Sequence, residues 1–193
     1  MFRTPKRQAG NAKDGSAEKK EGESLAKEQQ VNHLIEEIRR VLESVKDPEL
    51  PAISIAELGV LGEIDINEGH ATIHLLPTFS GCPALNIIEQ EVKDALSKID
   101  SVQTVNVQFV FNPPWTTDRI SPEGREKLKA YGISPPPAHH REGDPWEIDC
   151  PYCGSTYVTM ENIFGPTACR SILYCKNCKN PFEAMKPVAV GIN

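Results

Sequence analysis

Four of the six cysteines lie in two identical knuckles, Cys150-Pro-Tyr-Cys153 and Cys175-Lys-Asn-Cys178, with twenty-one residues between them. A Cys-x-x-Cys turn brings two thiolates close together. Two such turns can therefore place four thiolates as a tetrahedron around one metal ion. The separation slightly exceeds the usual 15–20 residues, and a longer loop costs little. We predict a structural Zn²⁺ site, because all four ligand positions are protein sulfurs and none is left for a substrate. Iron in a rubredoxin-like site is the alternative.

Cys82 stands apart from the knuckles, between Gly81 and Pro83. Proline fits the first position of a helix, so we expect Cys82 to be the N-cap of the helix that follows. The free N–H groups and the helix dipole would there favour a thiolate, the form that binds metals or attacks electrophiles. The alternative is a small buried residue with no chemical role.

Cys169 lies between the knuckles, in the segment Phe164-Gly-Pro-Thr-Ala-Cys-Arg170, without a partner at ligand spacing. One interpretation is a free thiol that only packs. The other is a fifth sulfur near the four-cysteine site, available for transient metal transfer.

Asp47-Pro-Glu49 supplies two carboxylates directly after a predicted helix. They could hold a cation or orient Cys82 at the rim of a site. In the simpler interpretation, Asp47 and Pro48 only end the helix and Glu49 is a solvated loop residue.

The apolar pattern predicts the elements that must position these residues. Apolar side chains at helical spacing indicate helices over residues 31–45 and 85–99. Alternation indicates a hairpin of strands 63–66 and 71–76 with a three-residue loop, and a further strand over 105–111. The predicted fold is α+β, a small sheet covered on one face by helices, followed by a C-terminal zinc-ribbon module.

Changes in composition suggest four segments along the 193 residues. The first is polar and glycine-containing, too poor in apolar residues to fold, although a frayed helix is an alternative. A proline-rich stretch is typical of a stiff linker before the ribbon. The predicted boundaries are a disordered tail at 1–30, an α+β domain at 31–133, a linker at 134–145 and the zinc ribbon at 146–193.

Composition and charge restrict the function. A net charge of −6 and a pI near 5.4 argue against a nucleic-acid partner held by phosphate contacts. No apolar run is long enough for a membrane span and no secretion signal is visible, so we expect a cytoplasmic protein without a membrane partner. In a reducing compartment, paired Cys-x-x-Cys knuckles bind metal and do not form disulfides.

Three motifs within residues 31–112 resemble the small α+β domain of iron–sulfur cluster assembly proteins related to SufT. They are Asp47-Pro-Glu49, Ile55-Ala-Glu-Leu-Gly59 and Thr78-Phe-Ser-Gly-Cys-Pro83. The resemblance implies that the Asp-Pro-Glu turn and Cys82 come together, with Cys82 as the functional residue.

The remaining chain resembles the D component of the phenylacetyl-coenzyme A epoxidase system, the PaaD type. The resemblance is carried by Asn112-Pro-Pro-Trp-Thr-Thr-Asp-Arg-Ile-Ser121, Gly124-Arg-Glu-Lys-Leu128, Tyr131-Gly-Ile133 and Phe164-Gly-Pro-Thr-Ala-Cys169, together with the terminal four-cysteine ribbon. Pro166 stands where that family often has Ser, and the long charged N-terminal segment departs from the usual family start. The resemblance also directs attention to Cys169 as a second functional thiol.

That family implies a non-catalytic accessory protein of aerobic phenylacetate breakdown. Its partners would be the diiron oxygenase subunit or the reductase, which carries flavin and an iron–sulfur cluster. Our first hypothesis is a maturation adaptor: Cys82 contacts transient iron or an iron–sulfur cluster, Asp47 and Glu49 shape the site, and the ribbon docks the partner. The second is a structural scaffold subunit with an inert Cys82. The third, an enzyme with Cys82 as nucleophile, lacks a visible base.

Overall fold

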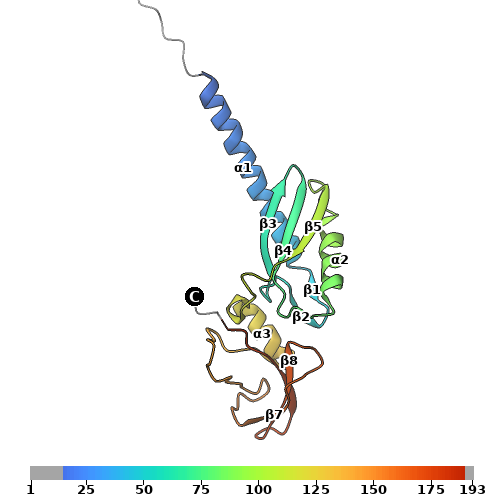
Figure 1. Cartoon of the computed structure of the whole chain (residues 1–193), viewed down its shortest axis with the longest axis vertical. Helices are drawn as coiled ribbons and strands as arrows, with labels where there is room; N and C mark the ends of the chain where they lie inside the picture. Colours follow the sequence, from blue (N-terminus) through green and yellow to red (C-terminus); the bar gives the residue numbers. More distant parts are fainter. Residues whose placement is uncertain (1–14, 190–193) are drawn as a thin grey trace, which may run out of the picture. The chain divides into compact units, whose positions relative to one another are not determined.

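The computed structural model describes residues 15–189 (Figure 1). The helices are α1 (Gly15–Leu42), α2 (Leu85–Leu96), the short 3₁₀ helix η1 (Thr117–Arg119) and α3 (Pro122–Ala130). The strands are β1 (Lys46–Asp47), β2 (Leu50–Ser54), β3 (Leu61–Asn67), β4 (His70–Leu75), β5 (Thr104–Phe109), β6 (Ile133–Ser134), β7 (Val158–Asn162), β8 (Arg170–Cys175) and β9 (Pro181–Met185). None of the helices in this part of the chain is long and apolar enough to cross a membrane.

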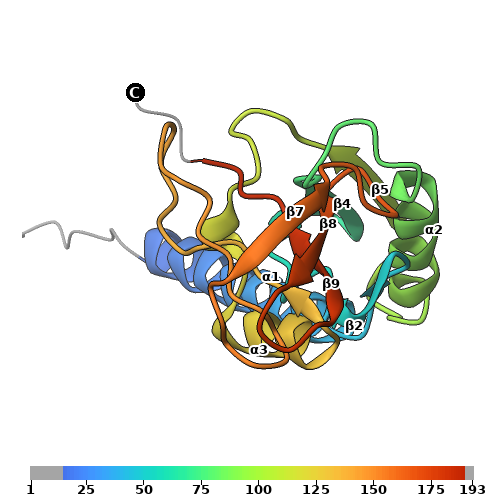
Figure 2. The same ribbon diagram turned by 90° about the horizontal axis from the view of Figure 1, so that it is seen from below.

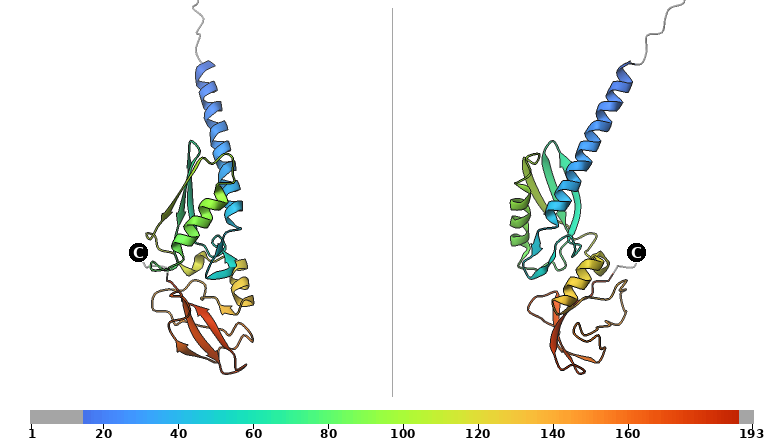
Figure 3. Two further views of the ribbon diagram at one scale, coloured as in Figure 1. Left: turned by 90° about the vertical axis from the view of Figure 1, so that its right-hand side faces the viewer. Right: turned by 180° about the vertical axis from the view of Figure 1, so that it is seen from behind.

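Strands β3, β4 and β5 form a sheet in that order, with β3 antiparallel and β5 parallel to β4. Alternation along β4 buries Ala71, Ile73 and Leu75 on one face. The C-terminal part of α1 and helix α2 cover that face, whereas the other face stays open (Figure 3). The predicted α+β class, with helices on one face of a small sheet, is therefore confirmed. The helices contribute Ile38, Leu42, Ile88, Val92 and Leu96 to the core.

The β3–β4 hairpin has a shorter loop than the sequence predicted. Asn67 pairs with His70, which leaves a two-residue turn of Glu68 and Gly69. Both turn residues have positive φ, 49° and 82°, as a turn of the mirror-image kind requires. Asn67 is thus the last residue of β3 and not part of a three-residue loop.

The N-terminal segment also differs from expectation. We expected residues 1–30 to be disordered, but α1 begins at Gly15, so residues 15–30 are helical. Lys and Glu in this stretch have good helix propensity, and that outweighs the cost of Gly22. Residues 1–14 lie outside the described residues.

The C-terminal residues form a second sheet, in the order β6–β9–β8–β7. Its small core contains Ile148, Leu173 and Phe182 together with two of the knuckle cysteines, Cys150 and Cys175. The metal ligands are therefore part of the core of the ribbon, as the predicted zinc-ribbon module requires.

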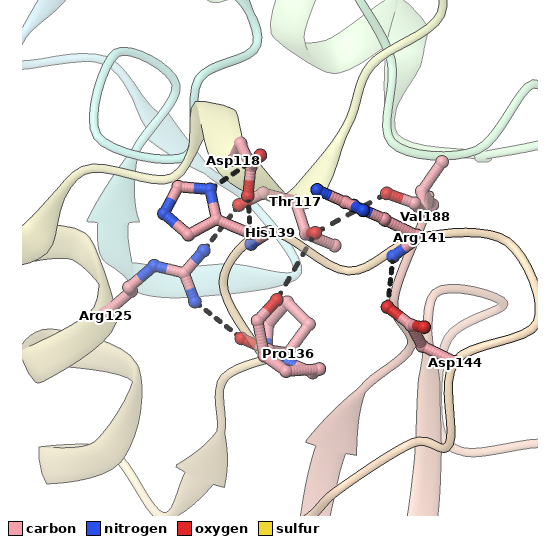
Figure 4. Close-up of polar contacts among 9 residues, drawn as sticks. Thr117, Asp118, Arg125, Pro136, His139, Arg141, Asp144 and Val188 are labelled. Atoms are coloured by element: carbon pink, nitrogen blue, oxygen red, sulfur yellow. Dashed lines mark hydrogen bonds and ion pairs between the residues drawn. The ribbon is translucent and has the colours of Figure 1, made fainter. Parts of the chain in front are cut away.

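The proline-rich stretch is anchored to the preceding helices (Figure 4). Arg125 of α3 donates to the carbonyl of Pro136 (2.5 Å) and to that of Thr117 (2.6 Å). The Asp118 carboxylate accepts from the His139 N–H (2.5 Å). Residues 134–145 are accordingly not a free tether, although the predicted domain boundaries themselves remain predictions.

Candidate functional site

The four knuckle cysteines converge as the spacing predicted. The Sγ atoms of Cys150, Cys153, Cys175 and Cys178 all lie within 4.8 Å of one another. Cys150 Sγ is 3.6 Å from Cys178 Sγ, and Cys153 Sγ is 3.7 Å from Cys175 Sγ. A tetrahedral zinc ion with Zn–S bonds of about 2.3 Å needs sulfur–sulfur distances of about 3.8 Å. The residues present therefore fit zinc, which would supply cross-linking and no open coordination position.

The electrostatics of the knuckles favour thiolate at Cys153 and Cys178. The pKa of Cys153 is lowered to about 6, first by a hydrogen bond from Asn177 and then by one from the Ser155 backbone. A hydrogen bond from Asn180 lowers the pKa of Cys178. Burial raises the pKa of Cys150 to about 12, a cost that a bound cation removes.

A second group of acidic side chains begins at the β1–β2 turn. Asp47 is 8% exposed, and its Oδ1 accepts the N–H groups of Glu49 (2.8 Å) and Leu50 (3.0 Å). These two bonds fix the turn and leave the Glu49 side chain half-exposed. Burial raises the pKa of Asp47 despite these hydrogen bonds. Asp47 thus holds the turn, and Glu49 is the carboxylate that remains free to bind.

Cys82 lies in the loop between β4 and α2, but it is not the N-cap of the helix. Helix α2 begins at Leu85, and Ala84 is its N-cap. The Pro83-Ala84 pair forms a turn ahead of the helix, so Cys82 lies two residues before the N-cap.

The environment of Cys82 also reverses the expected pKa. Burial raises the pKa of the thiol, and the charges of Glu49, Asp47 and Cys169 raise it further, against a hydrogen bond with the Ala84 backbone that lowers it. Each of the charged groups that act on Cys82 is an acid. Such a site disfavours a free thiolate and favours the binding of a cation.

Cys169 lies in the loop between β7 and β8. Figures 1 and 2 show this loop beside the β1–β2 turn and the start of α2. Burial raises the pKa of Cys169, and the charges of Asp47 and Glu49 add to that shift. Cys169 is not one of the four sulfurs gathered in the knuckles.

Arg170 is a functional candidate that the sequence did not single out. It is 7% exposed and its charge lowers the pKa of Cys169, Asp47 and Glu49. Its Nη1 lies 2.7 Å from Glu183 Oε2, an ionic contact without hydrogen-bond geometry. The sequence did contain a signal for this residue, because Arg170 is the charged first residue of a largely apolar strand, β8.

Two family domains match the chain. The PaaD zinc beta ribbon domain matches residues 134–186, and the iron–sulfur cluster assembly protein domain matches residues 35–109. A protein of Escherichia coli strain K12, named as a candidate D component of 1,2-phenylacetyl-CoA epoxidase, is 36% identical over 154 residues, which is 79% of this chain and 92% of that protein.

Shorter relatives match about half of this chain. The Fe–S protein maturation auxiliary factor YitW of Bacillus subtilis strain 168 is 43% identical over 46% of this chain and 86% of its own length. The factor SufT of Staphylococcus aureus strain USA300 is 38% identical over 47% of this chain and 99% of its own length. A crystal structure of a DUF59 domain from Bacillus anthracis is 32% identical, covers 48% of this chain and 89% of that one, and has a TM-score of 0.46.

Proposed function

Since the chain belongs to the PaaD family of phenylacetyl-CoA epoxidase components, we propose that it is a non-catalytic maturation factor that supplies iron or an iron–sulfur cluster to that epoxidase. An accessory role in iron–sulfur assembly agrees with the maturation factors that match about half of the chain and with the assembly-protein domain at residues 35–109. The client would be the diiron oxygenase subunit or the reductase, and the ribbon would dock it.

The observation that carries the proposal is the acidic surrounding of Cys82. A nucleophilic cysteine needs a lowered pKa, usually from a neighbouring base or cation. Burial, Glu49 and Asp47 instead raise the pKa of Cys82. A positively charged cargo would relieve this unfavourable environment, because it replaces the thiol proton and screens the carboxylates. This supports cargo binding over the nucleophilic enzyme.

A second candidate function is a structural scaffold in which Cys82 is inert. One substitution, Cys82→Ser, distinguishes this function from cargo transfer. The epoxidase subunits are produced together with either the wild-type chain or Cys82→Ser, and the iron content and activity of the purified epoxidase are measured. We expect Cys82→Ser to leave the complex assembled but poor in iron. Ser80→Ala, an exposed position in the same loop, is the matched control and should leave iron loading unchanged. Full iron loading with Cys82→Ser would leave the scaffold function and reject cargo transfer.

A further inference from the structure

Strand β7 lies at one edge of the ribbon sheet. In the order β6–β9–β8–β7, only β8 pairs with it among the described residues. The Tyr157 carbonyl accepts the Lys176 N–H (2.9 Å). Because neighbouring residues of an antiparallel pair alternate, the backbone groups of Thr159 face β8 and those of Met160 face away from it. Such an edge offers unpaired N–H and C=O groups to a further strand.

Two strongly exposed aromatic side chains flank this edge. Phe164 is 70% exposed and Tyr157 is 64% exposed, the two highest values among the large apolar side chains of the described residues. Met160 and Ile163, which lie between them in the chain, are exposed as well. Exposed apolar side chains gathered in one place mark interaction sites. We call these four residues, together with the free side of β7, the β7 surface.

The backbone that carries Ile163 and Phe164 is fixed, although both side chains are exposed. The Phe164 N–H donates to Asn162 Oδ1 (2.9 Å). The Ile163 carbonyl accepts a hydrogen bond from Ser171 Oγ of β8 (2.8 Å). A partner therefore meets a preformed anchor, which lowers the entropy cost of binding.

A lysine ammonium group lies over each of the two aromatic rings. Lys176 Nζ is 5.3 Å from the centre of the Tyr157 ring, and Lys186 Nζ is 5.1 Å from the centre of the Phe164 ring. Both distances are within the range of cation–π contacts. One acidic side chain, Glu161, lies between the two rings in the chain. Both ends of the β7 surface thus carry positive charge, in a chain whose net charge is −6.

We propose that the β7 surface binds an extended acidic segment of the client protein, which joins the ribbon sheet as a further strand. This inference rests on the proposed function, since it names the part of the ribbon that docks the client. The segment pairs with the outward backbone groups of β7, packs apolar side chains against the two rings, and brings carboxylates to Lys176 and Lys186. Main-chain hydrogen bonds supply affinity in such strand addition, and alternate side chains supply specificity.

The test is biolayer interferometry of the zinc-loaded full chain against the purified oxygenase and reductase subunits of the epoxidase. We expect Phe164→Ala and Tyr157→Ala each to weaken binding at least about tenfold, as truncation of aromatic anchors does at other interfaces. Tyr131→Ala removes a comparably exposed ring at the end of α3 and should bind like the wild type. Zinc content reports whether each variant keeps its ribbon.

Charge changes and hydrogen exchange test the chemistry of the bound segment. Lys176→Glu should weaken binding and Glu161→Lys should strengthen it, chiefly through the association rate and more strongly at low salt. In the complex, the Met160 N–H should exchange more slowly than in the free chain. Unchanged binding by both charge variants would reject an acidic partner.

The outcomes separate this inference from the proposed function. If the epoxidase binds the wild type and both ring variants equally well, or leaves Met160 unprotected, the β7 surface is rejected and the proposed function stands. If the wild type binds neither subunit, the proposed client is rejected, and a synthetic peptide of alternating valine and glutamate decides the inference.

Protection of the Met160 N–H by this peptide, and not by its counterpart with lysine in place of glutamate, would support the β7 surface. Absence of protection would overturn it. Stronger protection by oligouridylate would also overturn it, because stacking on the rings by a single-stranded nucleic acid would then explain the exposed aromatics.

Discussion

The electrostatic surroundings of Cys82 decide the chemistry that this residue can perform. A thiol with a raised pKa is mostly protonated at neutral pH, so it is a poor nucleophile in the free protein. A metal cation competes with the proton for the same sulfur and gains from each nearby carboxylate. Cys82 is therefore unreactive as a protonated thiol in the free protein and becomes a thiolate when a metal cation binds. This behaviour suits a protein that carries metal.

Neutralising Glu49 should lower the pKa of Cys82. Burial remains the largest cause of the raised pKa, but Glu49 is the first of the charges that add to it. In Glu49→Gln, Cys82 should therefore be alkylated faster than in the wild type at pH 7–8, measured by mass spectrometry of its peptide across a pH series. Glu43→Gln, an exposed carboxylate just after α1, should leave the rate unchanged. An equal rate in Glu49→Gln and wild type would show that Glu49 does not act on the thiol.

The Cys-x-x-Cys spacing was enough to predict the four-sulfur site, because the four ligands of one metal ion must come together whatever path the intervening chain takes. It could not predict the acidic surroundings of Cys82, since they depend on how the β1–β2 turn and the loop before α2 lie in the folded protein. The N-cap assignment of Cys82 was wrong for a local reason. The Pro83-Ala84 turn delays the start of α2 by two residues, and proline is compatible with either arrangement.

At the scale of elements, the segment after β2 is organised by Ser54 and Glu57. The Ser54 Oγ accepts the Glu57 N–H (3.1 Å), and Glu57 Oε2 accepts the Ser54 N–H (3.0 Å). This reciprocal pair is a capping box. Lys127 of α3 also bonds to Glu57, so the box joins the turn to α3. The same turn receives the Trp115 Nε1–H at the Leu58 carbonyl (3.0 Å).

Glu57 should give the protein a pH-dependent part of its stability. Partial burial raises the pKa of Glu57, but the hydrogen bonds from Lys127 and Ser54 outweigh it and lower the pKa. A lowered pKa contributes stability above the unfolded value of about 4.3, and that contribution is lost as pH falls through the folded value. We expect Glu57→Gln to cost up to about 1 kcal/mol at pH 7 and nothing in acid, measured by urea unfolding.

Two further variants separate charge from capping at this position. Glu57→Ala should cost roughly 0.5–2 kcal/mol more than Glu57→Gln at every pH, because the cap is lost as well. Glu126→Gln removes an exposed ion pair with Lys129 in α3 and should change little. A constant difference between wild type and Glu57→Gln down to strong acid would contradict the lowered pKa.

The spacing of apolar residues predicted which segments are helices and which are strands. It did not predict the residues at which these elements end. The alternation of Ala71, Ile73 and Leu75 required a half-buried strand, and the structure has one. Helix α2 ends at Leu96, ahead of the predicted end at residue 99, because Ile99 is buried from the following turn. Burial of an apolar residue thus does not require it to be helical.

For the whole molecule, the ribbon and the N-terminal domain differ in what holds them together. The iron–sulfur cluster assembly protein domain matches residues 35–109. Its core is formed by apolar residues from α1, α2 and the sheet. The ribbon core is small, and two of its buried members are metal ligands.

Removing zinc should therefore unfold the ribbon and spare the N-terminal domain. A structural zinc ion contributes folding free energy directly, and a core this small does not replace it. After exhaustive chelation of the full chain, hydrogen exchange should show loss of protection in β7, β8 and β9, with protection kept in β3, β4 and α2. Cys82→Ser with zinc bound should keep the wild-type exchange pattern, and a zinc-free ribbon that stays protected would refute this dependence on zinc.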